Sequence, residues 1–328
     1  MNETADAVPR PRVDVPARPP WRSLRVGVGV LWVLTSVTVL VLRLDTLLAG
    51  HPAYPVMLLV VLVAGVALVV AGWRGATRPR RPGWLPVVGR GLGVLAALLL
   101  VAVLVYLVPL PATPDAVASA SGSPSVRVTD STTRITLTPV GQPVRAGLVF
   151  QPGAKVDPRA YVPLLSSVSE QGFLVVVVKQ PFNVGFLASG APEVIIDAHP
   201  EVTSWAVGGH SLGGVAAGSF AGRLPTPVVG LLFWASYPLD SLADRDLVVA
   251  SVSGTLDGLS TPEDIEASRP LLPPSTTFVA IEGAVHAFFG DYGEQSGDGM
   301  PTVSRAEAQE QIVEASVALM AAVDAAEG

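Results

Sequence analysis

The most informative segment of the chain is Trp205-Ala206-Val207-Gly208-Gly209-His210-Ser211-Leu212-Gly213-Gly214. Its first three residues form a short apolar run that is typical of a buried strand, and an Ala- and Gly-rich helical pattern follows it. Between them, Gly209, Ser211 and Gly213 form a Gly-x-Ser-x-Gly motif. A serine on a sharp strand-to-helix turn projects its Oγ clear of the backbone, and the helix N-terminus favours negative charge developing there. The segment therefore predicts a nucleophilic serine at Ser211.

The rest of residues 125–328 alternates strand and helix patterns. Short apolar runs indicate buried strands at 147–150, 173–178, 205–207, 228–234, 247–252 and 277–281, and residues 134–139 alternate as an antiparallel strand would. Helical patterns lie between these runs, at 158–171, 192–199, 212–223, 262–271 and 304–326. This alternation predicts an α/β fold with a doubly wound, mostly parallel sheet. About 204 residues leave no room for a large cap domain.

A serine nucleophile needs a base, and histidine is the side chain whose pKa suits that role near neutrality. His286 lies in a glycine-flanked loop after the predicted strand 277–281, and such loops carry the active groups of parallel sheets. The other three histidines lie between apolar segments, upstream of the serine turn, or beside the serine and directed away from its Oγ: His51, His199 and His210. We therefore expect His286 to be the base.

The imidazole in turn needs an acid, and the oxyanion needs two backbone N–H donors. Asp257 lies in the turn after the predicted strand 247–252, and we expect it to be the acid. The other carboxylates between serine and histidine are the alternatives: Asp240, Asp244, Asp246, Glu263, Asp264, Glu266 and Glu282. We assign one oxyanion N–H to Leu212 and the second to Ala154, with Gly153 as its alternative.

The first part of the chain is apolar enough to enter a membrane. Uncharged stretches at 26–42, 54–73 and 91–110 are long enough to cross a bilayer. Arginines are concentrated before the first stretch and between the second and third, whereas the loop after the first has only Arg43. The positive-inside rule then predicts a basic cytoplasmic tail at 1–20, three transmembrane helices within 21–111 and an extracytoplasmic remainder. Small polar residues at 112–124 predict a flexible linker to a folded domain at 125–328.

Composition narrows the possible functions. Half of the 328 residues are hydrophobic, 15% are charged and the mean hydropathy is +0.51, which argues against a fully water-solvated protein. The net charge of −6 combines +7 in residues 1–111 with −13 in residues 112–328, and the acidic part is unsuited to nucleic acid. The absence of cysteine excludes disulfides, a thiolate nucleophile and Cys-ligated metals. We expect no metal and no cofactor, and we interpret the carboxylates Asp291, Glu294 and Asp298 as a solvated turn.

Residues 125–328 resemble the α/β-hydrolase fold, in particular its small, capless, dienelactone-hydrolase-like branch. The resemblance rests on four segments, which are Phe150 to Ala154, Gly208 to Gly214, Ser253 to Gly258 and His286 to Gly293. It implies a serine hydrolase that cleaves esters through an acyl-enzyme. Dienelactone hydrolases themselves use a cysteine nucleophile, which this chain lacks, so their substrate does not carry over.

Together these patterns predict a multi-pass membrane protein with an extracytoplasmic serine hydrolase domain and a Ser211, His286 and Asp257 triad. Its expected partners are the membrane and a small-molecule or lipid-like ester substrate. Two alternatives use the same sequence features. The triad could serve an acyltransferase or an amidase, because the pocket and not the motif chooses the acceptor. The hydrolase fold could also act as a binding module without catalysis.

Overall fold

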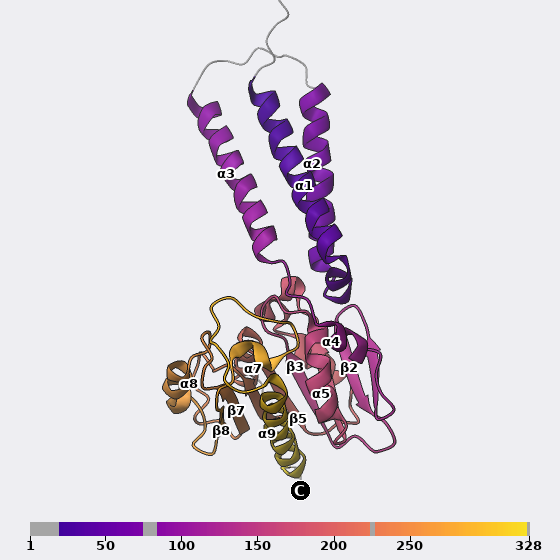
Figure 1. Ribbon diagram of the computed structural model, residues 1–328, viewed down its shortest axis with the longest axis vertical. Coiled ribbons are helices and arrows are strands. Elements are labelled where there is room, and N and C mark those ends of the chain that lie inside the picture. The colour runs from indigo at the N-terminus through magenta and orange to yellow at the C-terminus, as the bar shows by residue number, and fades with distance from the viewer. Residues whose placement is uncertain (1–19, 75–83, 224–226, 327–328) are drawn as a thin grey trace, which may run out of the picture. The chain divides into compact units, whose positions relative to one another are not determined.

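The computed structural model of the chain describes residues 20–74, 84–223 and 227–326 (Figure 1). The backbone contacts divide the chain into two units. The first comprises Met1–Val37 and Leu59–Ala102, and the second comprises Thr38–Leu58 and Val103–Gly328. Most of the arginines behind the predicted topology lie outside the described residues, namely Arg10, Arg12, Arg18, Arg78, Arg80 and Arg81.

Three long apolar helices begin the described chain: α1 (Pro20–Ala49), α2 (Ala53–Arg74) and α3 (Trp84–Tyr106). Each contains a segment long and apolar enough to cross a membrane, at Leu24–Ala49, Ala53–Arg74 and Val87–Tyr106. The third ends before residue 110, which was its predicted end, because Pro109 and Pro111 cannot continue a helix. The first continues to Ala49 through a non-helical residue, Arg43.

Within the first unit, α1 and α2 approach closely at two glycines. A Cβ placed on Gly29 would lie 2.6 Å from the carbonyl oxygen of Gly65, and one on Gly65 would lie 2.8 Å from that of Gly29. Small residues allow membrane helices to pack backbone against backbone, since lipid supplies no hydrophobic drive for their association. The two helices therefore pair through a contact that no larger residue would permit.

The second unit contains an eight-stranded sheet in the order β1-β2-β4-β3-β5-β6-β7-β8. Its strands are β1 (Val126–Asp130), β2 (Arg134–Pro139), β3 (Ala146–Gln151), β4 (Phe173–Val178), β5 (Trp205–His210), β6 (Val228–Trp234), β7 (Val248–Gly254) and β8 (Thr277–Ile281). The strands from β4 to β8 run parallel, and β2 pairs antiparallel with both β1 and β4. The predicted α/β fold with a mostly parallel sheet is thus confirmed.

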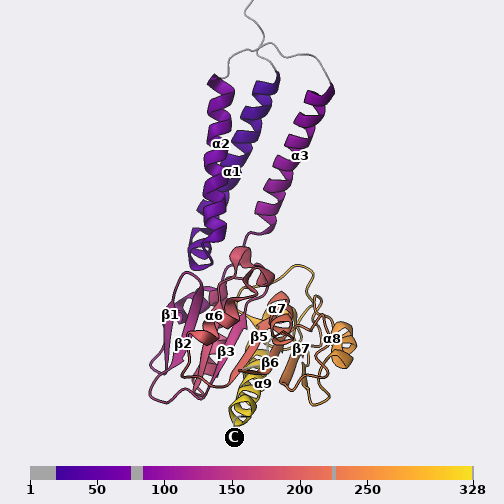
Figure 2. The ribbon, with the colours of Figure 1, turned by 180° about the vertical axis from the view of Figure 1, so that it is seen from behind.

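Helices cover both faces of this sheet (Figures 1 and 2). One core cluster joins the sheet to α5 (Val162–Ser169) and α9 (Arg305–Ala325), and a second joins it to α6 (Ala191–Asp197) and α7 (Leu212–Ala221). The short helix α8 (Pro262–Ser268) follows β7. Every residue of β3, β4 and β5 is buried, which explains why these strands are continuous apolar runs in the sequence.

The segment 112–124 differs from the flexible linker that its composition predicts. It contains the short helix α4 (Pro114–Ser119), and the side chain of Thr113 caps that helix by accepting the N–H of Ala116. Ala116 is completely buried, and the N–H of Thr113 donates to the carbonyl of Asp291. Small residues are compatible with a flexible tether, but they also allow close packing, and here they pack against the domain.

Candidate active site

Ser211 occupies a strained turn between β5 and α7. Its φ of 52° and ψ of −126° lie in a region that residues other than glycine rarely adopt. The N–H of Ser211 donates to the carbonyl of Trp234 at 2.9 Å, and the hydroxyl of Ser236 donates to the carbonyl of Ser211 at 2.7 Å. The neighbouring strand β6 and the residues after it therefore hold the serine backbone in this conformation.

The two glycines of the motif admit the end of β3. A Cβ on Gly209 would lie 2.5 Å from the carbonyl oxygen of Gln151, and one on Gly213 would lie 2.1 Å from the same atom. Real Cβ atoms do not approach backbone so closely, so only glycine fits at either position. This contact brings the turn after β3 against the serine turn.

Asp257 and His286 follow the carboxyl ends of β7 and β8, and they are in contact. The Nδ1 of His286 lies 2.8 Å from Oδ2 of Asp257, and both side chains are almost completely buried. The other carboxylate oxygen of Asp257 accepts the N–H groups of Leu259 and Ser260, each at 2.8 Å. The Nε2 of His286 is buried and bonds to none of the described residues. Nε2 is thus the imidazole nitrogen left to take a proton.

His210, the residue before the serine, packs against His286. Their ring centroids lie 4.5 Å apart, and the His210 ring stacks on Phe289 with 10° between the ring planes. The Tyr161 hydroxyl accepts the N–H of Gly153 at 2.9 Å and lies 2.9 Å from Nδ1 of His210. Tyr161 thus forms the one hydrogen bond of the His210 ring among the described residues, since Nε2 of His210 is buried and bonds to none of them. Burial, reinforced by the charge of nearby His286, lowers the pKa of His210 well below its usual value.

The turn after β3 presents backbone N–H groups to the site. The N–H of Gly153 is used by Tyr161, whereas those of Ala154 and Leu212 donate to no acceptor in the described part of the chain. The side-chain amide of Gln180 donates to the carbonyl of Pro152 at 3.2 Å. This hydrogen bond ties the turn after β3 to the loop after β4. Of the two alternatives left by the sequence, Ala154 is therefore the one with an available N–H.

Asp298 connects the loops that carry Asp257 and His286. One of its carboxylate oxygens accepts the N–H of Gly258 at 3.2 Å and of His286 at 3.0 Å, and the other accepts that of Ala287 at 2.8 Å. Asp298 is therefore not the solvated turn residue that its glycine-rich surroundings predict. No sequence signal identifies it, because the partners that connect the two loops are backbone groups of residues that lie 11 to 40 positions away.

The remaining candidates of the sequence analysis lie in other environments. Asp264 forms a capping box with Thr261 at the start of α8, and His199 contacts Glu201 near the surface. Asp291 accepts a hydrogen bond from Gln309. Among residues 20–74, 84–223 and 227–326, no group of three or more His, Asp or Glu side chains is arranged to hold a metal ion.

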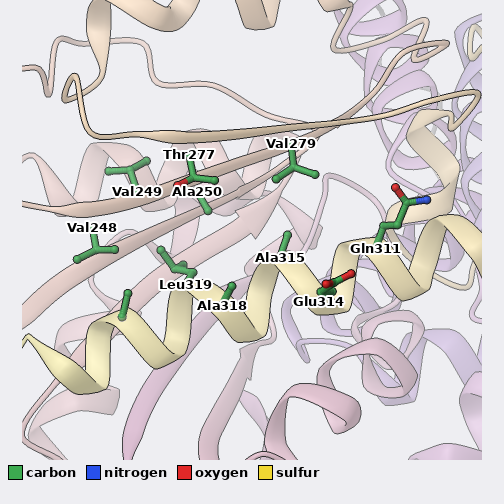
Figure 3. A pocket seen from close by; sticks show the side chains of 11 residues that line it. Val248, Val249, Ala250, Thr277, Val279, Gln311, Glu314, Ala315, Ala318 and Leu319 are labelled. Atoms are coloured by element: carbon green, nitrogen blue, oxygen red, sulfur yellow. The ribbon is translucent and has the colours of Figure 1, made fainter.

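A cavity of about 330 Å³ lies away from these residues, between α9 and the first halves of β7 and β8 (Figure 3). Figure 3 shows Val248, Val279 and Leu319 among its apolar lining, with Gln311 and Glu314 on the helix. Because the cavity is lined by the amino-terminal halves of the strands, it is separate from the edge that carries Asp257 and His286. We do not assign it to the active site.

Comparison with known proteins gives one family. The model of the alpha/beta hydrolase family matches residues 147–310, which is half of the chain. The curated proteins include no match to this sequence.

Solved structures similar to the chain include a predicted CIB-like hydrolase from Thermoplasma acidophilum, at 15% identity, TM-score 0.46, and coverage of 60% of this chain and 96% of that one. A putative dienelactone hydrolase from Klebsiella pneumoniae is similar at 14% identity and TM-score 0.45, with 61% and 97% coverage. Est1E from Butyrivibrio proteoclasticus is similar at 14% identity and TM-score 0.45, with 60% and 99% coverage.

The buried, neutral His210 predicts a loss of stability in acid. Its pKa in the folded state lies below that of the unfolded chain, so below about pH 6.5 only the unfolded state binds this proton. The contribution to the free energy of unfolding is present at neutral pH and falls by up to about 1.4 kcal/mol per pH unit as the pH decreases. Thermal unfolding of the full chain in detergent between pH 5 and 7 measures it.

We expect His210→Gln to flatten this pH dependence by one proton. If the His210→Gln variant keeps the full slope, the buried imidazole is not the group that titrates.

Proposed function

Because the chain belongs to the alpha/beta hydrolase family, we propose that it is a serine hydrolase of carboxylic esters. The observation that carries the proposal is the 2.8 Å contact between Asp257 and His286, beside a serine with positive φ in a Gly-x-Ser-x-Gly turn. A buried carboxylate bound to one nitrogen of an imidazole leaves the other nitrogen to act as a base. Three strands of one sheet, β5, β7 and β8, end before the serine, the acid and the histidine, and β6 lies between the first two of them.

In this mechanism Ser211 Oγ attacks the ester carbonyl while Nε2 of His286 takes its proton. Asp257 fixes the tautomer of His286 and stabilises the imidazolium that forms. The N–H groups of Leu212 and Ala154 would stabilise the negative oxygen of the tetrahedral intermediate. His286 then returns the proton to the departing alkoxide, which leaves an acyl-enzyme. Water, deprotonated by His286, attacks the acyl group and releases the carboxylic acid.

We also propose that α1, α2 and α3 anchor this domain to the cell membrane, with the domain on the extracytoplasmic side. Support for the anchor comes from the length and hydropathy of the three helices. Support for the orientation comes from the arginines of the sequence, which are concentrated before the first helix and between the second and third. An odd number of crossings then separates the N-terminus from the hydrolase domain.

The nucleophile is tested by covalent labelling. A fluorophosphonate probe should label the wild-type protein, because an activated serine attacks its phosphorus, and Ser211→Ala should abolish the labelling. The matched control is Ser241→Ala at an exposed serine, which should be labelled like the wild type. Absence of wild-type labelling, or labelling that survives Ser211→Ala, would contradict the proposed nucleophile.

Asp298 provides a test of how the catalytic loops are positioned. Asp298→Ala removes the acceptor shared by Gly258, His286 and Ala287, so the two loops should shift relative to each other. Misplacement of catalytic groups by about 1 Å can cost about a hundredfold in rate, and we expect kcat for a p-nitrophenyl ester to fall about 10- to 100-fold.

Asp298→Asn, which keeps one acceptor oxygen, should retain an intermediate rate. The control Glu294→Ala, at an exposed carboxylate of the same loop, should leave kcat unchanged; equal rates for all three variants would exclude the positioning role.

The orientation is tested by fusions to a reporter that is active only in the cytoplasm. A fusion at the C-terminus should be inactive, and the same reporter inserted within residues 75–83 should be active. Activity of the C-terminal fusion would place the hydrolase domain in the cytoplasm.

A further inference from the structure

The ends of the apolar helices contact the loops that form the candidate active site. Within the second unit, Tyr54 at the start of α2 lies edge-on to Phe182, with ring centroids 6.4 Å apart, and the Lys155 ammonium lies 4.1 Å from the centre of the Tyr106 ring at the end of α3. Lys155 and Phe182 follow the carboxyl ends of β3 and β4. Lys155 is also the residue next to Ala154, the candidate oxyanion donor.

Backbone pairing and an ion pair reinforce these contacts. Leu110, after α3, forms a parallel bridge with Val156. Arg159, whose side chain is nearly buried, bonds to the buried carboxylate of Asp157 and, at 2.6 Å, to Asp45 in the last turns of α1. Asp157 is buried and holds the guanidinium in place, whereas the Asp45 side chain is 77% exposed, so the link from Arg159 to α1 lies at the surface. The last turns of α1 and α3 and the first turn of α2 therefore contact loops at the carboxyl edge of the sheet.

The same edge carries most of the exposed apolar side chains of the domain. Eight large hydrophobic residues are exposed within the described part of 112–326, and six of them follow the carboxyl ends of the parallel strands β4, β6, β7 and β8. We call these six the apolar rim: Phe186, Leu187, Leu239, Leu256, Leu259 and Met300. Exposed apolar residues gathered around a site mark a surface that contacts lipid or another apolar partner.

The rim adjoins the proposed catalytic residues. Leu256 and Leu259 flank Asp257 in the sequence, and Phe186 and Leu187 follow Gly185. A Cβ on Gly185 would lie 3.4 Å from the carbonyl oxygen of Leu212, so this segment lies directly on the start of α7. An acyl chain lying along the rim would therefore lie close to the serine turn.

The net charge of the domain indicates which kind of lipid headgroup can approach the rim. Residues 112–328 carry a net charge of −13, which repels an anionic membrane surface and anionic headgroups. Because an anionic lipid would approach against this field, the apolar rim favours a neutral or zwitterionic molecule.

From these observations, and resting on the proposed function, we propose that the substrate is a neutral or zwitterionic lipid ester that reaches Ser211 directly from the bilayer. The ends of α1, α2 and α3 hold the carboxyl edge at the membrane surface, and the rim receives the acyl chain as it leaves the lipid. Water cleaves the acyl–oxygen bond through the acyl-enzyme, which yields a fatty acid and an alcohol. A water-soluble ester uses the same triad but gains nothing from the rim.

The experiment compares two esters with the same leaving group in the same sample. The full chain is reconstituted in phosphatidylcholine vesicles and assayed with p-nitrophenyl butyrate, which is water-soluble, and with p-nitrophenyl palmitate, which partitions into the bilayer. The rim variant combines Leu187→Gln, Leu239→Gln and Met300→Gln. The matched control combines Val140→Gln and Val194→Gln, at the two exposed apolar residues outside the rim.

We expect the rim variant to lose at least tenfold in kcat/KM for the palmitate and to stay within twofold of wild type for the butyrate. The control variant should match the wild type with both esters, and fluorophosphonate labelling of each variant verifies that its active site is folded. Equal losses for both esters, or no loss for the palmitate, would overturn the lipid-facing site while leaving the ester hydrolase intact. If neither ester is hydrolysed and the wild type is not labelled, the proposed function fails, and the inference fails with it.

Discussion

The contact between the end of β3 and the two glycines of the serine turn is the constraint on which the rest of the site depends. The carbonyl of Gln151 occupies the space that side chains at residues 209 and 213 would fill, so β3 and the serine turn approach to backbone contact. This approach places the turn after β3 beside the serine turn, in keeping with the pairing of Gln151 with Gly209 at the end of β3 and β5. Gly209 and Gly213 are therefore required by the close packing of β3 against the serine turn, whatever reaction the site catalyses.

The features set by local sequence could be predicted well. The strands 134–139, 173–178, 228–234 and 277–281 coincide with β2, β4, β6 and β8. β4 and β6 are buried apolar runs, as parallel strands inside a sheet need to be, and β2 alternates buried and half-buried residues, as its sequence does. The pairing of Asp257 with His286 agrees with their expected positions after neighbouring strands, since parallel strands bring their carboxyl ends to one edge. Their catalytic roles remain proposals.

Features that depend on distant partners could not be predicted. The helix α4 owes its order to the burial of Ala116 and to a hydrogen bond with Asp291, neither of which leaves a trace in a segment of small residues. His210 takes its partner Tyr161 from a different part of the chain, so its burial and its neutral state are invisible in the motif itself. Asp298 is the strongest case, because a carboxylate between two glycines is the usual sign of an exposed turn.

The hydrogen bonds of Asp298 have a consequence for how the domain could change over evolutionary time. Its carboxylate closes the loop that leaves His286, so residues 290–297 are bounded at both ends by fixed backbone. Tyr292, which is buried and packs on the His210 ring, fixes the first part of this loop as well. Variation in length is therefore tolerated only around the exposed Glu294, between Tyr292 and Asp298, where it would not move the imidazole.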